Sequence, residues 1–209
     1  EGVFTNAPRW LSFRPTALWE VEKSQHLEKL HNSLEAMGSE RGSWQPIAFE
    51  AKFGSNGSPS LVLERDGDLV RIHGIIDRVD RNPDGEVRVI DYKTGSSNIG
   101  NRDLVEGTRL QLPVYAKAAE LALELGEVVD GFYWLINAGS PSSLTLTKFK
   151  SEQGEGFDAA CRIAINHIHN NVNMVRRGNF RAKTPQKGCA VYCPASIYCW
   201  RYQARSNNG

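Results

Sequence analysis

Apolar positions along the chain follow helical spacing in some segments and strand spacing in others. Near the start, apolar side chains recur every three to four residues, which predicts a helix over residues 15–36. Pro15 suits the first turn of this helix, and Gly38 is expected to end it. The same spacing returns over residues 110–125 and 157–177, so two further helices are predicted.

Shorter apolar runs between these helices predict β-strands. They cover residues 47–53, 61–64, 69–79, 86–93, 131–137 and 144–150. The turn sequence at residues 82–85, Asn-Pro-Asp-Gly, predicts a hairpin between the third and fourth runs. This order of elements predicts an α/β fold with one mixed sheet flanked by helices, in a single domain of residues 1–209.

Composition narrows the class of protein. The 209 residues are 40% hydrophobic, which excludes wholesale disorder. No apolar run approaches the roughly 18 residues of a membrane span, which excludes an integral membrane protein. The first residues lack the pattern of a secretory signal and an initiator Met, so we expect a piece of a longer protein.

The net charge of +1 conceals an uneven distribution. Residues 159–209 contain eight Lys or Arg and no Asp or Glu, so the preceding part is rich in carboxylates. This division fits a protein that holds cations and contacts a polyanion. A solvated basic terminus explains the charge equally well.

Two acidic residues and a lysine are predicted to meet on one face of the sheet. Alternate side chains of a strand share a face, so Asp91 and Lys93 project together while Ile90 and Tyr92 point away. If the hairpin forms across residues 82–85, Asp77 approaches Asp91.

Adjacent carboxylates repel each other unless a proton or a cation lies between them. Mg²⁺ (or Mn²⁺) is the expected cation, because it prefers carboxylate and phosphate oxygens. Lys93 would orient an attacking water, and Glu50 could add a third carboxylate. The structural alternative is that Asp77 and Asp91 only form ion pairs, with Arg78 or Lys93.

Three segments carry a resemblance to a known family. GIIDRVD at residues 74–80, VIDYKTG at 89–95 and QLPVYA at 111–116 resemble the signature of RecB/AddB-type PD-(D/E)XK nucleases. The resemblance implies a restriction-endonuclease-like fold. It also implies metal ligation by Asp77, Asp91 and the Tyr92 carbonyl, catalysis by Lys93, and an acidic contribution from Glu50. Gln111 and Tyr115 match the family's Q-x-x-x-Y segment, whose spacing places both on one helical face.

Residues 186–209 form a cysteine-rich tail with three thiols, Cys189, Cys193 and Cys199, within eleven residues. They could hold zinc or an iron–sulfur cluster, or lie buried without a ligand. The tail resembles that of AddB-type nucleases, in which three late cysteines and one early cysteine hold a [4Fe–4S] cluster.

The chain departs from that pattern in two respects. No Cys precedes Glu50, and Cys161, in a predicted helix, is expected to pack rather than to act as the fourth ligand. The family's helical active-site His should also lie well upstream, whereas His26 and His31 lie too close to the first strand. We therefore expect a fragment that begins after both residues, with an incomplete or lost cluster.

Two other signals are weaker. Residues 95–100 have the glycine spacing of a P-loop, but Asn101-Arg102 replace Lys-Ser/Thr, which excludes a nucleotide motor at this loop. The tryptophans are scattered, and we expect them to pack in the core or in grooves rather than to stack on bases.

Together these patterns predict a cytoplasmic, Mg²⁺-dependent DNA nuclease, expected to be an exonuclease on single-stranded ends. Its partners would be DNA and the helicase part of a repair and recombination helicase–nuclease, with Arg78, Arg176 and Arg177 holding the DNA strand. One alternative is a DNA-binding or scaffold module with weak or absent cleavage. Another is a zinc-clamped interaction domain.

Overall fold

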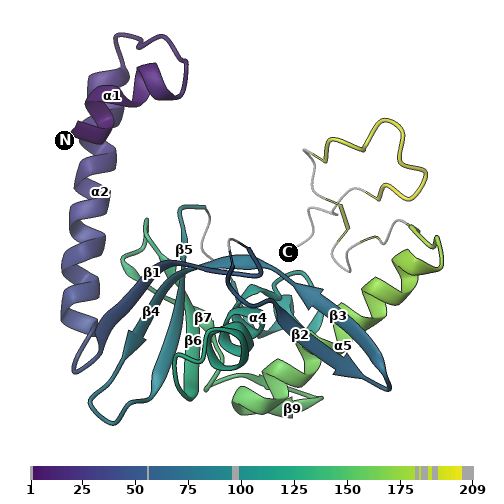
Figure 1. The fold of residues 1–209 in the computed structure, drawn as a ribbon. Coiled ribbons are helices and arrows are strands. Elements are labelled where there is room, and N and C mark those ends of the chain that lie inside the picture. The colour runs from purple at the N-terminus through teal and green to yellow at the C-terminus, as the bar shows by residue number, and fades with distance from the viewer. Residues whose placement is uncertain are drawn as a thin grey trace. The chain divides into compact units, whose positions relative to one another are not determined.

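The computed structural model describes residues 2–55, 57–95, 99–181, 184, 188–189 and 193–203 (Figure 1). Contacts divide the chain into two compact units, Glu1–His169 and Asn170–Gly209, and each is described by itself. The expectation of one domain with a tail at residues 186–209 stays a prediction. No helix in the described residues has the length and apolar character of a membrane crossing.

The helices of the first unit follow the predicted order with shifted ends. They are α1 (Gly2–Trp10), α2 (Trp19–Glu40), α3 (Asn101–Val105), α4 (Gln111–Lys117), which runs on into the π-helical turn η1 (Ala118–Ala122), and α5 (Gly156–Arg176), whose last residues enter the second unit. Gly38 does not end α2, contrary to expectation. The helix ends at Glu40, just before Gly42, whose φ of +57° is the left-handed conformation that terminates helices.

The strands form one mixed sheet and two small hairpins. The strands are β1 (Gln45–Phe53), β2 (Leu61–Arg65), β3 (Asp68–Ile72), β4 (Gly74–Arg81), β5 (Val87–Lys93), β6 (Val128–Leu135), β7 (Ser140–Thr145), β8 (Lys150–Ser151) and β9 (Gly154–Glu155). The five-stranded sheet has the order β1-β4-β5-β6-β7, in which only β5 and β6 are parallel. The α/β prediction of a mixed sheet flanked by helices is confirmed.

The prediction of one strand over residues 69–79 is wrong, because the strand is interrupted at His73. β3 pairs with β2 in a separate hairpin, and β4 begins at Gly74 in the main sheet. The backbones pass very close at this point: a Cβ at Gly54 would lie 2.5 Å from the His73 Cβ, and one at Gly74 would lie 2.9 Å from the Phe53 ring. The strand predicted at residues 144–150 is likewise shifted, since β7 ends at Thr145.

Both faces of the main sheet are covered. On one face, the buried Leu112, Pro113 and Ala116 of α4 pack toward β5 and β6. On the other, Met37 of α2 packs in a cluster with Ile90, Phe132 and Trp134. Alternating residues of β5 and β6 therefore face different helices, and the α4 face carries the candidate catalytic residues.

Candidate active site

The hairpin of β4 and β5 brings Asp77 to Asp91. Its register pairs Arg78 with Ile90 and Val79 with Val89, and the same register places Asp77 opposite Asp91. Asp77 Oδ2 accepts a hydrogen bond of 2.9 Å from the Tyr92 backbone N–H. The prediction that the two carboxylates approach across the turn agrees with this geometry.

Asp91 is a buried acid with one close cation. Its side chain is 2% exposed, and Lys93 Nζ lies 2.5 Å from Oδ2 as an ion pair. Burial raises the pKa of Asp91, the Lys93 ammonium opposes that rise, and the Asp77 charge adds to it. The contact with Lys93 is an ion pair, and Oδ2 accepts no further hydrogen bond from any described residue.

The start of α4 extends this pair into a chain of polar contacts. Lys93 Nζ donates a hydrogen bond of 3.0 Å to Gln111 Oε1, and Gln111 Nε2 lies 3.4 Å from the Tyr115 hydroxyl oxygen, to which it donates. Burial raises the pKa of the Tyr115 phenol, and the charges of Asp91 and Asp77 reinforce that shift against the Gln111 hydrogen bond. The helix thus presents Gln111 and Tyr115 to the carboxylate pair.

Glu50 lies on the neighbouring strand but does not join the cluster. In the register of β1 and β4 it falls opposite Asp77, between the pairs Phe49–Arg78 and Ala51–Ile76. Its side chain is exposed and its φ is +49°, a left-handed conformation that is strained for a residue with a Cβ. No group of three or more His, Cys, Asp or Glu within the described ranges is arranged to hold a metal ion.

The two-carboxylate set still fits a divalent cation. Mg²⁺ commonly takes one or two carboxylates and completes its shell with water and substrate phosphate. Asp91 Oδ2, which is buried and contacts the Lys93 ammonium as an ion pair, and the nearby Asp77 carboxylate are oxygen donors of the kind that such an ion takes. The contribution of the Tyr92 carbonyl stays a prediction.

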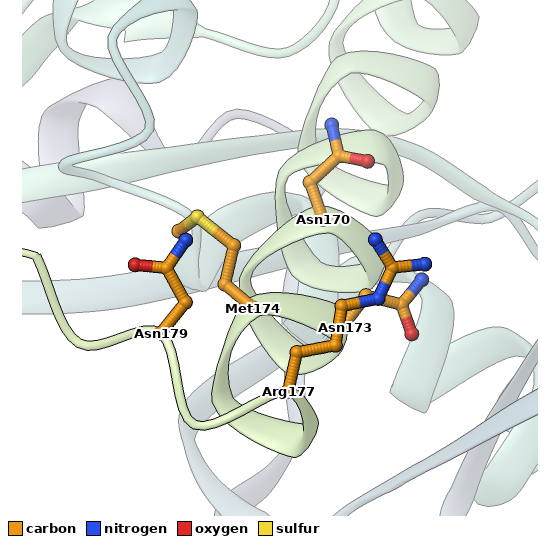
Figure 2. A pocket seen from close by; sticks show the side chains of 5 residues that line it. All are labelled: Asn170, Asn173, Met174, Arg177 and Asn179. Atoms are coloured by element: carbon orange, nitrogen blue, oxygen red, sulfur yellow. The ribbon is translucent and has the colours of Figure 1, made fainter.

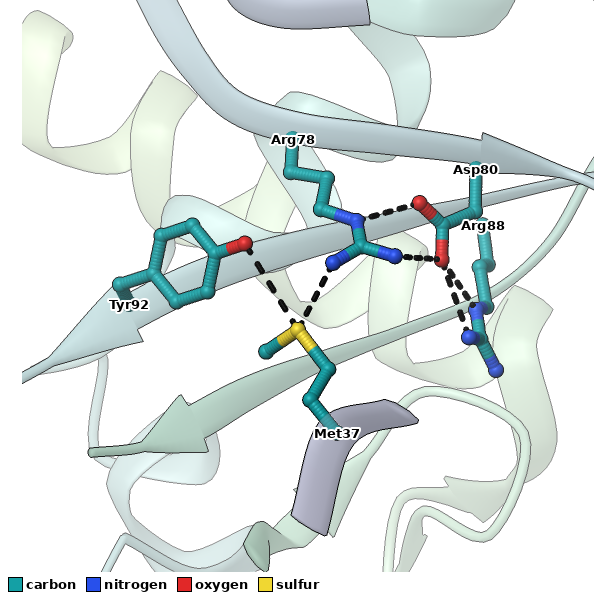
Figure 3. A network of polar contacts seen from close by, with 5 residues as sticks. All are labelled: Met37, Arg78, Asp80, Arg88 and Tyr92. Carbon is teal, nitrogen blue, oxygen red and sulfur yellow. Dashed lines mark hydrogen bonds and ion pairs between the residues drawn. The ribbon is translucent and has the colours of Figure 1, made fainter. Parts of the chain in front are cut away.

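A buried ionic network supports the same strands from the opposite face (Figure 3). The Arg78 side chain donates to both carboxylate oxygens of Asp80 at 2.5 and 3.0 Å, and to the Met37 sulfur at 2.7 Å. Arg88 reaches the same carboxylate at 3.0 Å, and the Tyr92 hydroxyl lies 3.8 Å from the Met37 sulfur. The network joins α2 to β4 and β5 directly behind Asp77 and Asp91.

This network corrects one expectation. Arg78 is 6% exposed, so its predicted role as a DNA contact is wrong. Neighbouring residues of a strand point to opposite faces, so the side chain after Asp77 is directed into the core. Of the ion pairs in the structural alternative, Arg78–Asp77 does not form, because Arg78 pairs with Asp80, whereas Lys93–Asp91 does form.

Two further residues, which the sequence patterns do not indicate, lie beside the cluster. Tyr133 lies opposite Asp91 in the β5–β6 register, and its ring centroid is 5.3 Å from Lys93 Nζ. Arg109, two residues before Gln111, lowers the pKa of Asp91 through its charge. In the sequence, Tyr133 belongs to an apolar run that indicates only a buried strand. Arg109 belongs to a segment without a periodic pattern, so neither residue is recognisable there as part of a site.

His26, His31 and Cys161 contact residues outside the carboxylate–lysine set. His26 stacks on Phe4 at 6.4 Å, and the exposed His31 lies 3.6 Å from Glu35. Cys161 is buried in α5, and burial raises the pKa of its thiol to about 12, which suits the expected packing role.

Cys189, Cys193 and Cys199 are free and partly buried, and they form no metal-binding group in the described part of the chain. The iron–sulfur cluster therefore stays a prediction. The expectation that the tryptophans pack is wrong for Trp10 and Trp200, which are 64% and 79% exposed.

Comparison with known proteins finds similarity to nucleases. The sequence profile of the PD-(D/E)XK nuclease superfamily matches residues 4–200. Over 83 residues the chain is 42% identical to a subunit of the ATP-dependent helicase/deoxyribonuclease of Clostridioides difficile (strain 630), covering 37% of this chain and 7% of that protein. It is 32% identical over 130 residues to the protein of the same name from Thermoanaerobacter sp. (strain X514), covering 56% of this chain and 10% of that protein.

The chain spans a tenth or less of the length of these relatives. The family match, in contrast, covers nearly the whole chain and includes the three segments that build the carboxylate–lysine site. The chain belongs to the PD-(D/E)XK nuclease superfamily.

Proposed function

We propose that this chain is a metal-dependent deoxyribonuclease domain that hydrolyses phosphodiester bonds. The observation that supports it best is the chain of contacts from Asp91 through Lys93 to Gln111 of α4, with Asp77 opposite Asp91 in the β4–β5 register. Two carboxylates beside an ammonium group suit phosphodiester hydrolysis, in which negative charge develops on the phosphate.

Each side chain has a role that follows from its contacts. Asp77 and Asp91 would hold Mg²⁺ or Mn²⁺, which supplies positive charge to the scissile phosphate and to the attacking water. Lys93, anchored between Asp91 and Gln111, would orient that water, and Gln111 would fix the ammonium position. The water oxygen forms a new bond to phosphorus, the P–O bond to the leaving group breaks, and the proton that the water loses balances the one that the leaving oxygen gains.

The setting of the domain is also proposed. The relatives are named as subunits of an ATP-dependent helicase/deoxyribonuclease. We therefore infer that this chain acts beside a helicase in DNA repair and recombination, as an exonuclease on single-stranded ends. A [4Fe–4S] cluster held by Cys189, Cys193 and Cys199 belongs to the same proposal, through family resemblance alone.

The test compares cleavage of end-labelled single-stranded and duplex DNA in Mg²⁺, in Mn²⁺ and in EDTA. Asp91→Ala and Lys93→Ala should each lower the cleavage rate by about 10²- to 10⁴-fold, the range for loss of an essential catalytic group. Matched controls are Asp84→Ala in the exposed turn of the same hairpin and Lys148→Ala on the surface.

Equal rates in all four variants would refute the catalytic assignment. DNA binding without cleavage in any divalent metal would select the alternative of a binding or scaffold module. The exposed position of Glu50 outside the carboxylate pair is the observation that favours that alternative.

A further inference from the structure

The second unit carries basic residues without acidic ones. Residues 170–209 contain no Asp or Glu, so no acidic side chain of this unit can neutralise its cations. The basic residues of the unit are Arg176, Arg177, Arg181, Lys183, Lys187, Arg201 and Arg205. A segment whose charged side chains are all basic attracts a polyanion at long range.

Three large aromatic side chains among the described residues of this unit are exposed. Phe180, Tyr198 and Trp200 are 75%, 78% and 79% exposed, whereas Tyr133 and Trp134 of the first unit are buried. Phe180 and Trp200 each directly precede an arginine in the sequence. The Arg201 guanidinium lies 4.4 Å from the Trp200 ring centroid, which covers one face of the indole. With 79% of its surface exposed within the described residues, the indole can still stack on a planar partner.

A polar hollow lies at the end of α5 in the same unit (Figure 2). Its volume is about 370 Å³, and it is lined by Asn170, Asn173, Met174, Arg177 and Asn179. The chain reverses there because Gly178 adopts a φ of +67°, and the Asn179 N–H then bonds to the Met174 carbonyl at 2.9 Å. Figure 2 shows the amide groups and the Arg177 guanidinium around the last helical turns.

Nucleic acid explains this combination better than a protein partner does. Aromatic residues and Arg are also common at protein interfaces, but a segment with seven basic residues and no Asp or Glu suits a polyanion. Surfaces for single-stranded nucleic acid combine such cations with exposed aromatic rings. Amide side chains offer both donors and acceptors, as the edges of bases require. Stacking also needs bases that are not already stacked in a duplex.

We propose that the second unit binds single-stranded DNA, with Phe180 and Trp200 stacking on bases and Arg177 contacting phosphate. The binding is independent of catalysis by Asp77 and Asp91, and it rests on the proposed function only for the choice of DNA as the polyanion.

Binding of fluorescein-labelled dT20 to the full chain is measured by fluorescence anisotropy in EDTA, where metal-dependent cleavage is absent. Phe180→Ala and Trp200→Ala should each weaken the Kd by about 5- to 150-fold, the range for loss of one base stack. The matched control Trp10→Ala removes an exposed tryptophan from the first unit and should leave the Kd unchanged. Far-UV circular dichroism verifies that each variant is folded.

Salt dependence supplies the second readout. Arg177→Ala should reduce the slope of log K against log salt by about 0.7, the value for one single-strand phosphate contact, while the exposed Arg14→Ala should not. A 20-base-pair duplex should bind more weakly than dT20. Unchanged Kd in both aromatic variants, or equal affinity for the duplex, would overturn the proposal.

The two proposals fail separately. Loss of dT20 binding in the aromatic variants together with inactive wild-type protein would refute cleavage alone. Normal cleavage with unaltered binding in Phe180→Ala and Trp200→Ala would refute the second-unit surface alone.

Discussion

Asp91 shows how a candidate catalytic residue can oppose stability. It lies in the core, where burial disfavours its charge, and the Lys93 ammonium only partly compensates. The nearby Asp77 charge adds to the penalty. A divalent cation would relieve the repulsion between the two carboxylates, so we expect metal binding and folding to be coupled at this residue.

Asp91→Asn should therefore stabilise the metal-free protein while it abolishes cleavage. Because the folded-state pKa of Asp91 is raised, its contribution to stability is complete below its ordinary value of 3.8 and is lost as the pH rises through the raised pKa. Asp91→Asn has no titrating carboxyl group at this position and does not lose stability in this way. The difference in free energy of unfolding between the variant and the wild type should therefore grow from pH 4 to pH 8.

Thermal denaturation across that pH range checks the prediction. Mg²⁺ should raise the Tm of the wild type and leave that of Asp91→Asn unchanged. The exposed Asp84→Asn is the control and should follow the wild type in both respects. A variant less stable than wild type at pH 8 would show that the Lys93 ion pair outweighs burial.

At the level of elements, the sheet face opposite the candidate site is stabilised by a buried ionic network as well as by apolar packing. Asp80, which is fully buried, accepts hydrogen bonds from both Arg78 and Arg88, and Arg78 also reaches the Met37 sulfur of α2. The Arg88 guanidinium additionally lies 4.7 Å from the Trp44 ring centroid. One helix and two strands are thereby held in register behind the site.

Arg78→Ala should lower the free energy of unfolding by about 3 to 5 kcal/mol, because it breaks a buried ion pair and leaves the Asp80 charge undercompensated. Arg71→Ala, on the exposed face of β3, should change it by less than about 0.5 kcal/mol. Urea denaturation measures both values. Similar small changes in the two variants would mean that Arg88 alone satisfies Asp80.

At the level of the whole molecule, the two units differ in chemistry. The first holds all the acidic residues and the candidate catalytic set, and the second holds three of the four cysteines and no carboxylate side chain. Thiol accessibility follows the same division, since Cys161 is buried in the first unit while Cys189, Cys193 and Cys199 are partly exposed.

In native protein without a bound cluster, a thiol-reactive dye such as DTNB should therefore label three cysteines rapidly at pH 8. Cys161, whose pKa burial raises to about 12, should react only after denaturation in guanidinium. Fewer than three rapid thiols, rising to three after a chelator releases iron or zinc, would instead show that the tail cysteines hold a metal. Four rapid thiols would contradict the burial of Cys161.

Local patterns were sufficient for much of this architecture. Alternation in β5 separates Asp91 and Lys93 from Ile90 and Tyr92, and the turn at residues 82–85 sets the hairpin register that faces Asp77 toward Asp91. Helical spacing of four likewise places Gln111 and Tyr115 together. These relations depend on neighbours a few residues apart, which is why the sequence predicts them.

Long-range packing accounts for the rest. The break at His73 arises where two backbone segments pass in contact near Gly54, and the burial of Arg78 depends on Met37, which is 41 residues away in the chain. The proximity of Tyr133 to Lys93 follows from the parallel pairing of β5 with β6 across the intervening helices. Hydrophobic periodicity carries no record of which distant segments pair, because that choice is made by complementary packing in three dimensions.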